Sequence, residues 1–256
     1  NGRHEGTLRY EYGNYDLRAE TSLQLDAGLS FNAKHISAEI SLFQNNIDHY
    51  IFTEKLLAKN GMDSIPDPSE PVPAYRYIQG KASMTGGEFS IDVHPHPLDW
   101  LHFENGFSFV SALNRTRIED DSAKYLPFIP APRFQSELRA NFKKSGDHLT
   151  NLFIKIEFNH TWQQDRVLLE NRTETLTPSY SLWNAGLGTD INKRNGSTLF
   201  TFYLTVNNIL DAVYQSHLSR LKYAAENVAT GRIGVFNMGR NFSFKIVVPL
   251  SFRKSS

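Results

Sequence analysis

Several arginine and tyrosine side chains in this sequence could bind an anionic ligand. Arg115 and Arg117 precede Tyr125 in one charged segment, and Arg166 and Arg172 lie close together in another. A guanidinium group binds a carboxylate or phosphate through two parallel hydrogen bonds, so such clusters suit ligands that carry these groups. Charged loops are also common without a ligand, and a solvated loop is the simpler interpretation.

A second candidate is the run Tyr75, Arg76 and Tyr77, which lies at the start of an expected strand. Two aromatic rings around a cation could form a stacking platform for a ligand. Tyrosines at a strand end are equally typical of the aromatic girdle at a membrane interface, and we favour the girdle.

Metal binding and catalysis have weaker support. His94-Pro-His96 supplies only two imidazoles in a tight turn, and Glu119-Asp120-Asp121 is an acidic run of the kind that usually faces water. We find no Ser-His-Asp, paired-carboxylate, phosphate-loop or HExxH arrangement, and His160 with Asp165 is a thin basis for a protease. The sequence therefore predicts no metal, no cofactor and no enzymatic activity.

Composition excludes further classes of protein. The 256 residues carry 27 basic and 27 acidic side chains and no cysteine. Charge balance argues against a nucleic-acid partner, because proteins that bind nucleic acid usually show a basic excess. The longest apolar run falls far short of the roughly 20 residues that a membrane-spanning helix needs.

The elements that must position the candidate residues are long amphipathic strands. In residues 241 to 252, one face is apolar and the other mostly polar; the apolar face carries Phe242, Phe244, Ile246, Val248, Leu250 and Phe252, and the other carries Asn241, Ser243, Lys245, Val247, Pro249 and Ser251. One whole face of such a strand meets an apolar environment. The same alternation recurs in strands beginning near residues 22, 36, 75, 100, 133, 149, 180, 198 and 239, and residues 7 to 12 offer a possible tenth. Most of these segments reach the nine to eleven residues, roughly, that a tilted transmembrane strand needs.

The connections between these strands alternate in length. Short turns are expected at residues 32–34, 95–99, 143–147 and 192–195, and long connections at 53–73, 115–130, 165–178 and 208–238. One rim of the sheet therefore carries tight turns and the other carries loops, as in bacterial outer-membrane barrels. The chain reads as one domain, residues 1–256, of an all-β transmembrane antiparallel β-barrel.

The apolar alternation changes phase inside two strands. Between residues 75 and 94 it passes from Ile78, Ala82 and Met84 to Phe89, Ile91 and Val93, with Gly86-Gly87 at the change. Glycines at such a point predict a β-bulge or a sharp bend. A similar change separates Ile40 and Leu42 from Phe43, Ile47 and Ile51.

Three motifs carry a resemblance to a known family. The segment from Glu11 to Leu29 resembles the Leu-Pro/Ala-Glu segment of TonB-dependent outer-membrane receptors, of the type common in Bacteroidetes. Val206-Asn-Asn-Ile-Leu-Asp-Ala-Val-Tyr214 is similar to the family's Val-Asn-Asn-Leu-Phe-Asp-xx-Tyr signature. The resemblance assigns Asn207, Asn208, Asp211 and Tyr214 to this signature. Gly239, Arg240 and Asn241 resemble the opening of the family's last strand, and Phe252 its terminal aromatic residue, here followed by four more residues.

The resemblance implies a function in nutrient import. Such receptors form a barrel of about 22 strands in the outer membrane of Gram-negative bacteria, closed by an N-terminal plug domain that contacts TonB. This chain would be the C-terminal nine to ten strands, without the plug, in contact with lipid, the plug and a small-molecule nutrient. A ferric siderophore or haem is favoured over a saccharide or cobalamin. The alternatives are a plugless porin or adhesin, a small closed barrel of eight or ten strands, and a soluble β-sandwich.

Overall fold

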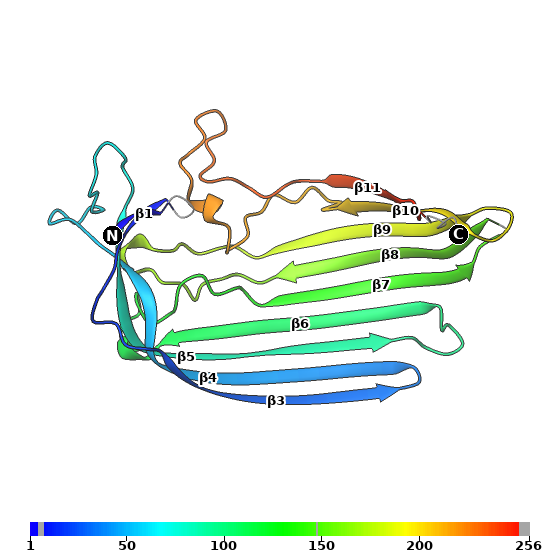
Figure 1. Cartoon of the computed structure of the whole chain (residues 1–256), viewed down its shortest axis with the longest axis horizontal. Helices are drawn as coiled ribbons and strands as arrows, with labels where there is room; N and C mark the ends of the chain where they lie inside the picture. Colours follow the sequence, from blue (N-terminus) through cyan, green and yellow to red (C-terminus); the bar gives the residue numbers. More distant parts are fainter. Residues whose placement is uncertain (5–7, 147, 251–256) are drawn as a thin grey trace, which may run out of the picture.

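The computed structural model describes residues 1–4, 8–146 and 148–250, and its strands form one sheet (Figure 1). The strands of this sheet are β1 (Gly2–His4), β2 (Arg9–Tyr12), β3 (Thr21–Ala33), β4 (Ile36–Lys55), β5 (Ala74–Val93), β6 (Leu101–Asn114), β7 (Arg133–Lys144), β8 (Leu149–Thr161), β9 (Tyr180–Asn192), β10 (Thr198–Asn207) and β11 (Asn241–Val247). Three short 3-10 helices, η1 (Arg115–Arg117), η2 (Glu170–Arg172) and η3 (Arg220–Tyr223), lie in the connections.

The strands from β3 to β11 form an antiparallel meander in which each strand pairs with its neighbours in sequence. The nine predicted strands are confirmed, and each begins within two residues of its predicted start. Among the described residues, β3 and β11 each pair on one side only, so this part of the sheet is open. No helix in the described part of the chain is long and apolar enough to cross a membrane.

The possible tenth strand is not a spanning strand. Residues 9–12 form the short β2, which pairs in parallel with the start of β5, while residue 7 lies outside the described residues. The pairing of β5 with β6 begins only at Ala82. The first residues of β5 therefore do not pair with β6, and they pair with β2 on that side instead.

The two faces of the meander differ in chemistry. The apolar face carries a cross-strand row in which Phe103 lies opposite Leu138, and Leu138 opposite Ile156. Phe244 extends this face on β11 and is 75% exposed. The polar face carries a row in which Asp92, Glu104, Glu137 and Glu157 lie opposite one another in turn. Each strand thus presents one face to an apolar medium and one to a polar space.

The glycine pair in β5 does not form a bulge. Pairing with β4 and β6 is regular at Gly86 and Gly87. A Cβ atom at Gly86 would lie 2.5 Å from the Phe43 ring and 2.7 Å from the backbone oxygen of Phe109. The glycines are therefore required by the close approach of neighbours from β4 and β6, and the predicted bulge at this point is wrong.

The irregularity lies in β4 instead, between Ile47 and Tyr50. His49 has a positive φ of 59° there, and the backbone N–H of Ile51 donates to the Glu20 carboxylate at 2.5 Å. Glu20 belongs to the first family-like motif, so the structure gives its carboxylate a local role: it accepts a backbone donor beside the bulge.

The change of apolar phase has a packing cause. Ala82 and Ala112 pack with Leu126 of the β6–β7 connection, and Ile47, Tyr50, Met84 and Ile129 surround them. Because this connection folds over the polar face of β4, β5 and β6, the ends of these strands bury apolar side chains on that face. Farther along these strands, the apolar residues lie on the opposite face.

The predicted asymmetry of the connections is confirmed. Two residues join β3 to β4, whereas the long connections span residues 56–73, 115–132, 162–179 and 208–240. The long connections lie at the left end of the sheet in Figure 1 and the tight turns at the right end. We call these ends the loop rim and the turn rim.

Candidate functional site

The long connections at the loop rim pack against one another and form what we call the loop cluster: residues 56–73, 115–132, 162–179 and 208–240. Backbone contacts already join two of them, since the N–H of Glu170 donates to the carbonyl of Ser122 at 2.8 Å. The loops are thus fastened to each other and not only to their own strands.

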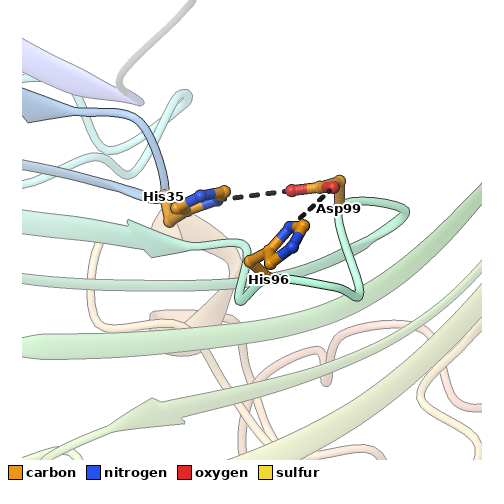
Figure 2. A group of neighbouring side chains, drawn as sticks. All are labelled: His35, His96 and Asp99. Atoms are coloured by element: carbon orange, nitrogen blue, oxygen red, sulfur yellow. Dashed lines mark ion pairs between the residues drawn. The ribbon is translucent and has the colours of Figure 1, made fainter.

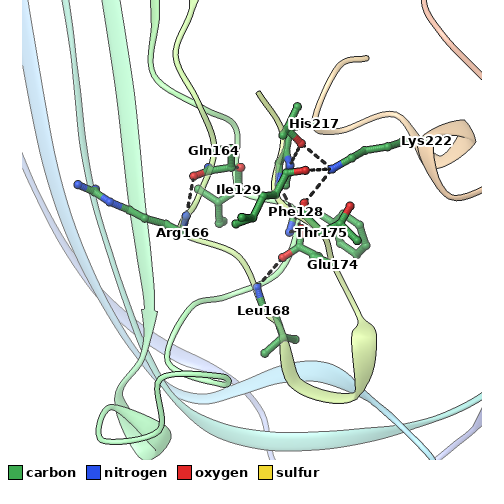
Figure 3. A network of polar contacts seen from close by, with 11 residues as sticks. Phe128, Ile129, Gln164, Arg166, Leu168, Glu174, Thr175, His217 and Lys222 are labelled. Atoms are coloured by element: carbon green, nitrogen blue, oxygen red, sulfur yellow. Dashed lines mark hydrogen bonds and ion pairs between the residues drawn. The ribbon is translucent and has the colours of Figure 1, made fainter. Parts of the chain in front are cut away.

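Glu174 is the centre of a buried polar network (Figure 3). Its Oε1 accepts from the backbone N–H of Phe128 at 2.7 Å, and its Oε2 from that of Leu168 at 2.8 Å. Its side chain is fully buried, and Nε2 of His217 lies 3.2 Å from Oε1 at an ion-pair distance without hydrogen-bond alignment. One carboxylate therefore joins three of the four loops.

Lys222 fastens the β10–β11 loop to the β8–β9 loop. Its ammonium donates to the carbonyls of Thr175 and Leu176 and to the hydroxyl of Thr177, at 2.8, 2.9 and 2.6 Å. Thr177 is also hydrogen-bonded to Nδ1 of His217. Burial lowers the pKa of Lys222, and Glu174 acts in the opposite direction.

Arg117 joins the loops on the other side of the cluster. Its guanidinium pairs with Glu54, at the end of β4, and with Glu170 of the β8–β9 loop. The hydrogen bond to Glu54 raises the pKa of Arg117, with a further contribution from Glu170. Arg172 pairs with Asp63 at 2.9 Å and thereby joins the β8–β9 loop to the β4–β5 loop.

The predicted ligand-binding residues divide into two groups. Arg117 and Arg172 are engaged in these ion pairs, Tyr75 is buried beneath the Arg9 guanidinium at 4.4 Å, and the Tyr77 hydroxyl donates to Glu11. Tyr125 lies beneath the Lys124 ammonium, 5.4 Å from its ring centroid.

The side chains of Arg76, Arg115 and Arg166 are exposed instead. Within the described residues, the guanidinium groups of Arg115 and Arg166 have no ion-pair partner. Their role in binding a ligand stays a prediction.

Sequence reasoning missed the residues that hold the loop cluster together. Glu174 lies more than 40 residues before His217 and Lys222 in the sequence, and no local spacing links it to them. The acidic run that we considered for cation binding is engaged locally, since Asp120 accepts from Ser122 and Asp121 pairs with Lys124.

Two hollows lie between the loop cluster and the polar face of the sheet. One, of about 330 Å³, is bounded by Glu88, Ser108 and Arg133 of the strands and by Ser216 and His217 of the β10–β11 loop. The other, of about 500 Å³, lies farther along the same loop and is lined mainly by apolar and amide side chains, among them Asn184, Asn207, Tyr214 and Asn237. Both have room for part of a small-molecule ligand.

The Asn-Asn signature forms a clamp at the start of the β10–β11 loop. The Asn208 side chain donates to the backbone carbonyl of Ala212 and accepts from its backbone N–H. The backbone N–H of Asn208 donates to the side-chain oxygen of Asn184. Asp211 accepts from the N–H of Arg240, whose Nε donates to the carbonyl of Ile209, each at 2.7 Å. A side chain at Gly239 would meet the Asp211 carboxylate at 2.3 Å.

The rings of Tyr180 and Tyr214 lie 4.5 Å apart at the same junction, and Asn241 opens β11 opposite Asn207. The two ends of a loop of more than 30 residues are thereby held together. The assembly residue Phe252 lies outside the described residues.

Long antiparallel strands with one apolar and one polar face, tight turns on one rim and packed loops on the other define the wall of a membrane β-barrel. Comparison with known proteins agrees: the sequence model of a family described as "TonB dependent receptor-like, beta-barrel" matches residues 1–209. The chain belongs to this family.

Solved structures show the same fold at low sequence identity. The chain is similar to the copper transporter OprC, with 16% identity and a TM-score of 0.70 over 91% of this chain and 32% of that one. For the FrpB iron transporter from Neisseria meningitidis (F3-3 variant), the identity is 13% and the TM-score 0.62, over 91% of this chain and 31% of that one. For the ferric yersiniabactin uptake receptor FyuA from Yersinia pestis, the identity is 13% and the TM-score 0.57, over 90% of this chain and 30% of that one.

The chain spans about a third of the length of these proteins. Barrels of this family lie in the outer membrane of Gram-negative bacteria, and the apolar face of this chain is placed in that membrane. The family consists of transport receptors, which are in general not enzymes.

Proposed function

We propose that this chain is part of a receptor that imports a scarce, bulky nutrient across the outer membrane, with energy supplied through TonB. In this proposal the loop cluster captures the ligand and the strands form the barrel wall. The observation that carries the proposal is the packing of four long loops into one network at the loop rim, within a chain of this family. A ligand that contacts one loop thereby gains a physical connection to the others.

The polar face suits a plug domain inside the barrel. Glu104, Glu137 and Glu157 lie on neighbouring strands, and Lys155 pairs with the last two at 2.7 and 3.5 Å. These carboxylates face the space inside the barrel and offer acceptors to basic and amide groups of a folded partner. TonB would act through that plug and not through this chain.

We infer that the ligand is a ferric siderophore or haem in preference to a saccharide or cobalamin. Exposed Arg115 and Arg166 favour a ligand with carboxylate or other anionic oxygens, which siderophores and haem both carry. FrpB is an iron transporter and FyuA is a ferric yersiniabactin uptake receptor. This choice rests on the charge of the loops and on those relatives together.

Uptake by cells that express the full-length receptor tests the proposal. Iron-starved cells lacking their other receptors are given radioactive iron as a panel of ferric siderophores and as haem. Uptake of one of these should depend on both the receptor and TonB. Replacing Arg115 and Arg166 together with alanine should weaken ligand binding at least about tenfold, because a hydrogen bond to a charged group contributes roughly 1.5–3 kcal/mol. Lys59→Ala, an exposed loop cation, is the matched control.

Three outcomes would overturn parts of the proposal. Solute passage that persists without TonB would indicate a passive porin, and cell attachment without uptake an adhesin; the family assignment favours neither. TonB-dependent uptake of a saccharide or cobalamin alone would retain the receptor and reject the iron-containing ligand.

A further inference from the structure

Four histidines and two aspartates gather at the turn rim, opposite the loop cluster. His35 belongs to the β3–β4 turn, and Asp92, His94, His96, Asp99 and His102 belong to the β5–β6 connection and the strand ends beside it. The ring centroid of His35 lies 5.8 Å from that of His94 and 5.5 Å from that of His96. The ring centroids of His94 and His102 are 5.3 Å apart. Two hairpin turns thus bring together side chains that are distant in sequence.

Asp92, His94 and His102 form the inner group. The Asp92 Oδ2 atom lies 3.3 Å from Nδ1 of His102 and 3.8 Å from Nδ1 of His94, and the three ligand atoms lie within 4.8 Å of one another. Ligands about 2.0–2.1 Å from a tetrahedral zinc ion lie roughly 3.3 Å apart. The three atoms therefore need only small side-chain rotations to surround one ion.

The tautomer of His94 is suited to a ligand. Its Nε2 lies 2.7 Å from the backbone carbonyl of Lys34, and a carbonyl can only accept, so Nε2 carries the hydrogen. In the neutral ring Nδ1 then presents a lone pair toward the Asp92 carboxylate, another acceptor. Such a hydrogen bond behind the ring is the usual way that a metal-binding histidine is oriented.

Oδ2 of Asp92 is already hydrogen-bonded to Nδ1 of His102 at 3.3 Å, but other atoms of the two groups have no hydrogen-bond partner. Within the described residues, Nδ1 of His94, Nδ1 of His35 and Oδ1 of Asp92 are buried without one. Two acceptors that face each other away from water are unfavourable unless a cation lies between them. A bound ion would satisfy the lone pairs of His94 and Asp92 together.

His35, His96 and Asp99 form the outer group (Figure 2). Nδ1 of His35 lies 3.3 Å from Asp99 Oδ1, and Nδ1 of His96 lies 3.4 Å from Asp99 Oδ2. This group is more open, since the side chains of His96 and Asp99 are 65% and 58% exposed. An ion held here would join the β3–β4 turn to the β5–β6 turn.

We propose that the turn rim binds divalent transition-metal ions of the Zn²⁺ class, one in the inner group and a second, more weakly, in the outer group. Imidazole and carboxylate donors suit Zn²⁺, Ni²⁺ and Cu²⁺ better than Ca²⁺ or Mg²⁺, which prefer oxygen ligands. A nearby hollow of about 370 Å³ on the polar face, bounded by Glu39, Asp92, Glu104 and Glu137, adds negative potential that attracts cations. The site is separate from the loop cluster, so it does not depend on the proposed nutrient.

Zinc titration of the full-length protein in detergent tests this proposal. The protein carries no histidine tag and is first treated with a chelator, and binding is followed by calorimetry. We expect His102→Ala to remove one bound ion, His96→Ala to remove the second, more weakly held one, and the double variant to lose both. Asp92→Asn keeps the side-chain shape but removes the charge, and should weaken the tighter site at least about tenfold.

His148→Ala is the matched control, because His148 is an exposed histidine of the neighbouring β7–β8 turn at the same rim. It should leave the number of bound ions and their affinities unchanged. Cobalt substitution gives a second readout: the visible absorption of four-coordinate Co²⁺ should appear in the wild type and be lost in His102→Ala. Unchanged stoichiometry in both alanine variants, or no saturable zinc binding at micromolar concentration, would overturn the proposal.

Discussion

The loop cluster and the strand wall obtain their order in opposite ways. Leu126 and Val167, the largest fully buried side chains in the described part of the chain, lie in loops, whereas Phe244 in the wall is 75% exposed. A single sheet has no second layer to cover its faces, so its strands depend on backbone pairing and on the medium around them. The loops cover one another and depend on particular side-chain contacts. Loop order should therefore respond to single polar changes, and wall order to changes in face polarity or in space between strands.

The largest effect is expected from Glu174→Gln in the loop cluster. Glutamine keeps the shape of the side chain but turns one of two acceptors into a donor that faces a backbone N–H. Leaving a buried donor unsatisfied and removing the charge near His217 should cost about 3 kcal/mol of loop stability. Hydrogen exchange of the Phe128 and Leu168 amides should accelerate roughly 100-fold. Glu119→Gln, an exposed change in the same cluster, should leave these rates unaltered.

In the wall, Phe244→Lys places a charge on the apolar face. It should lower the free energy of unfolding in lipid by about 2–4 kcal/mol if the residue lies near the midplane. Lys245→Ala, on the polar face of the same strand, should be milder. Denaturant titration in lipid vesicles compares the two variants. The reverse ranking would show that the faces are assigned the wrong way round.

A backbone test of the wall is Gly86→Ala. The added Cβ would lie 2.7 Å from the Phe109 carbonyl oxygen, which cannot move without disturbing the strand pairing, so we expect a loss of about 1–3 kcal/mol in the same titration. Gly106→Ala, on β6, is the matched control: its nearest neighbour would be 3.9 Å away. If both variants were equally stable, close strand approach would not be the reason for glycine at Gly86.

The smallest effect concerns pH. Burial lowers the pKa of Lys222 below the usual lysine value of about 10.4, so the open cluster binds more protons than the closed one in the alkaline range just below that value. The free energy that keeps the loop closed should therefore rise as pH increases through this range. Hydrogen exchange, corrected for its intrinsic pH dependence, should show a shallow rise in protection that Lys222→Met abolishes. A protection that falls with pH would mean that Lys222 is stabilised as a cation.

The same contrast explains what could be predicted from sequence. Strand starts and the asymmetry of the rims follow from alternation and turn residues, which are local properties, and all nine strands were found. The bulge expected at Gly86-Gly87 was wrong because the phase change reflects Leu126 packing across from another segment. The Glu174 network was missed because it unites residues from separate hairpins, and the turn-rim groups were missed because His35 comes from another hairpin and His102 from the next strand. Only His94 and His96 are close enough in sequence to be noticed, and they supply one ligand to each group.

The β4–β5 hairpin has a consequence for recognition by antibodies. Each strand is 20 residues long, about 66 Å at 3.3 Å per residue, whereas a tilted strand needs only about ten residues to cross the membrane. Several residues of each strand therefore extend beyond the membrane at the loop rim as paired sheet, with β2 paired to the β5 edge. An antibody raised against this part of the native protein would recognise a rigid epitope built from three strands, and would fail to bind the denatured chain or its isolated peptides.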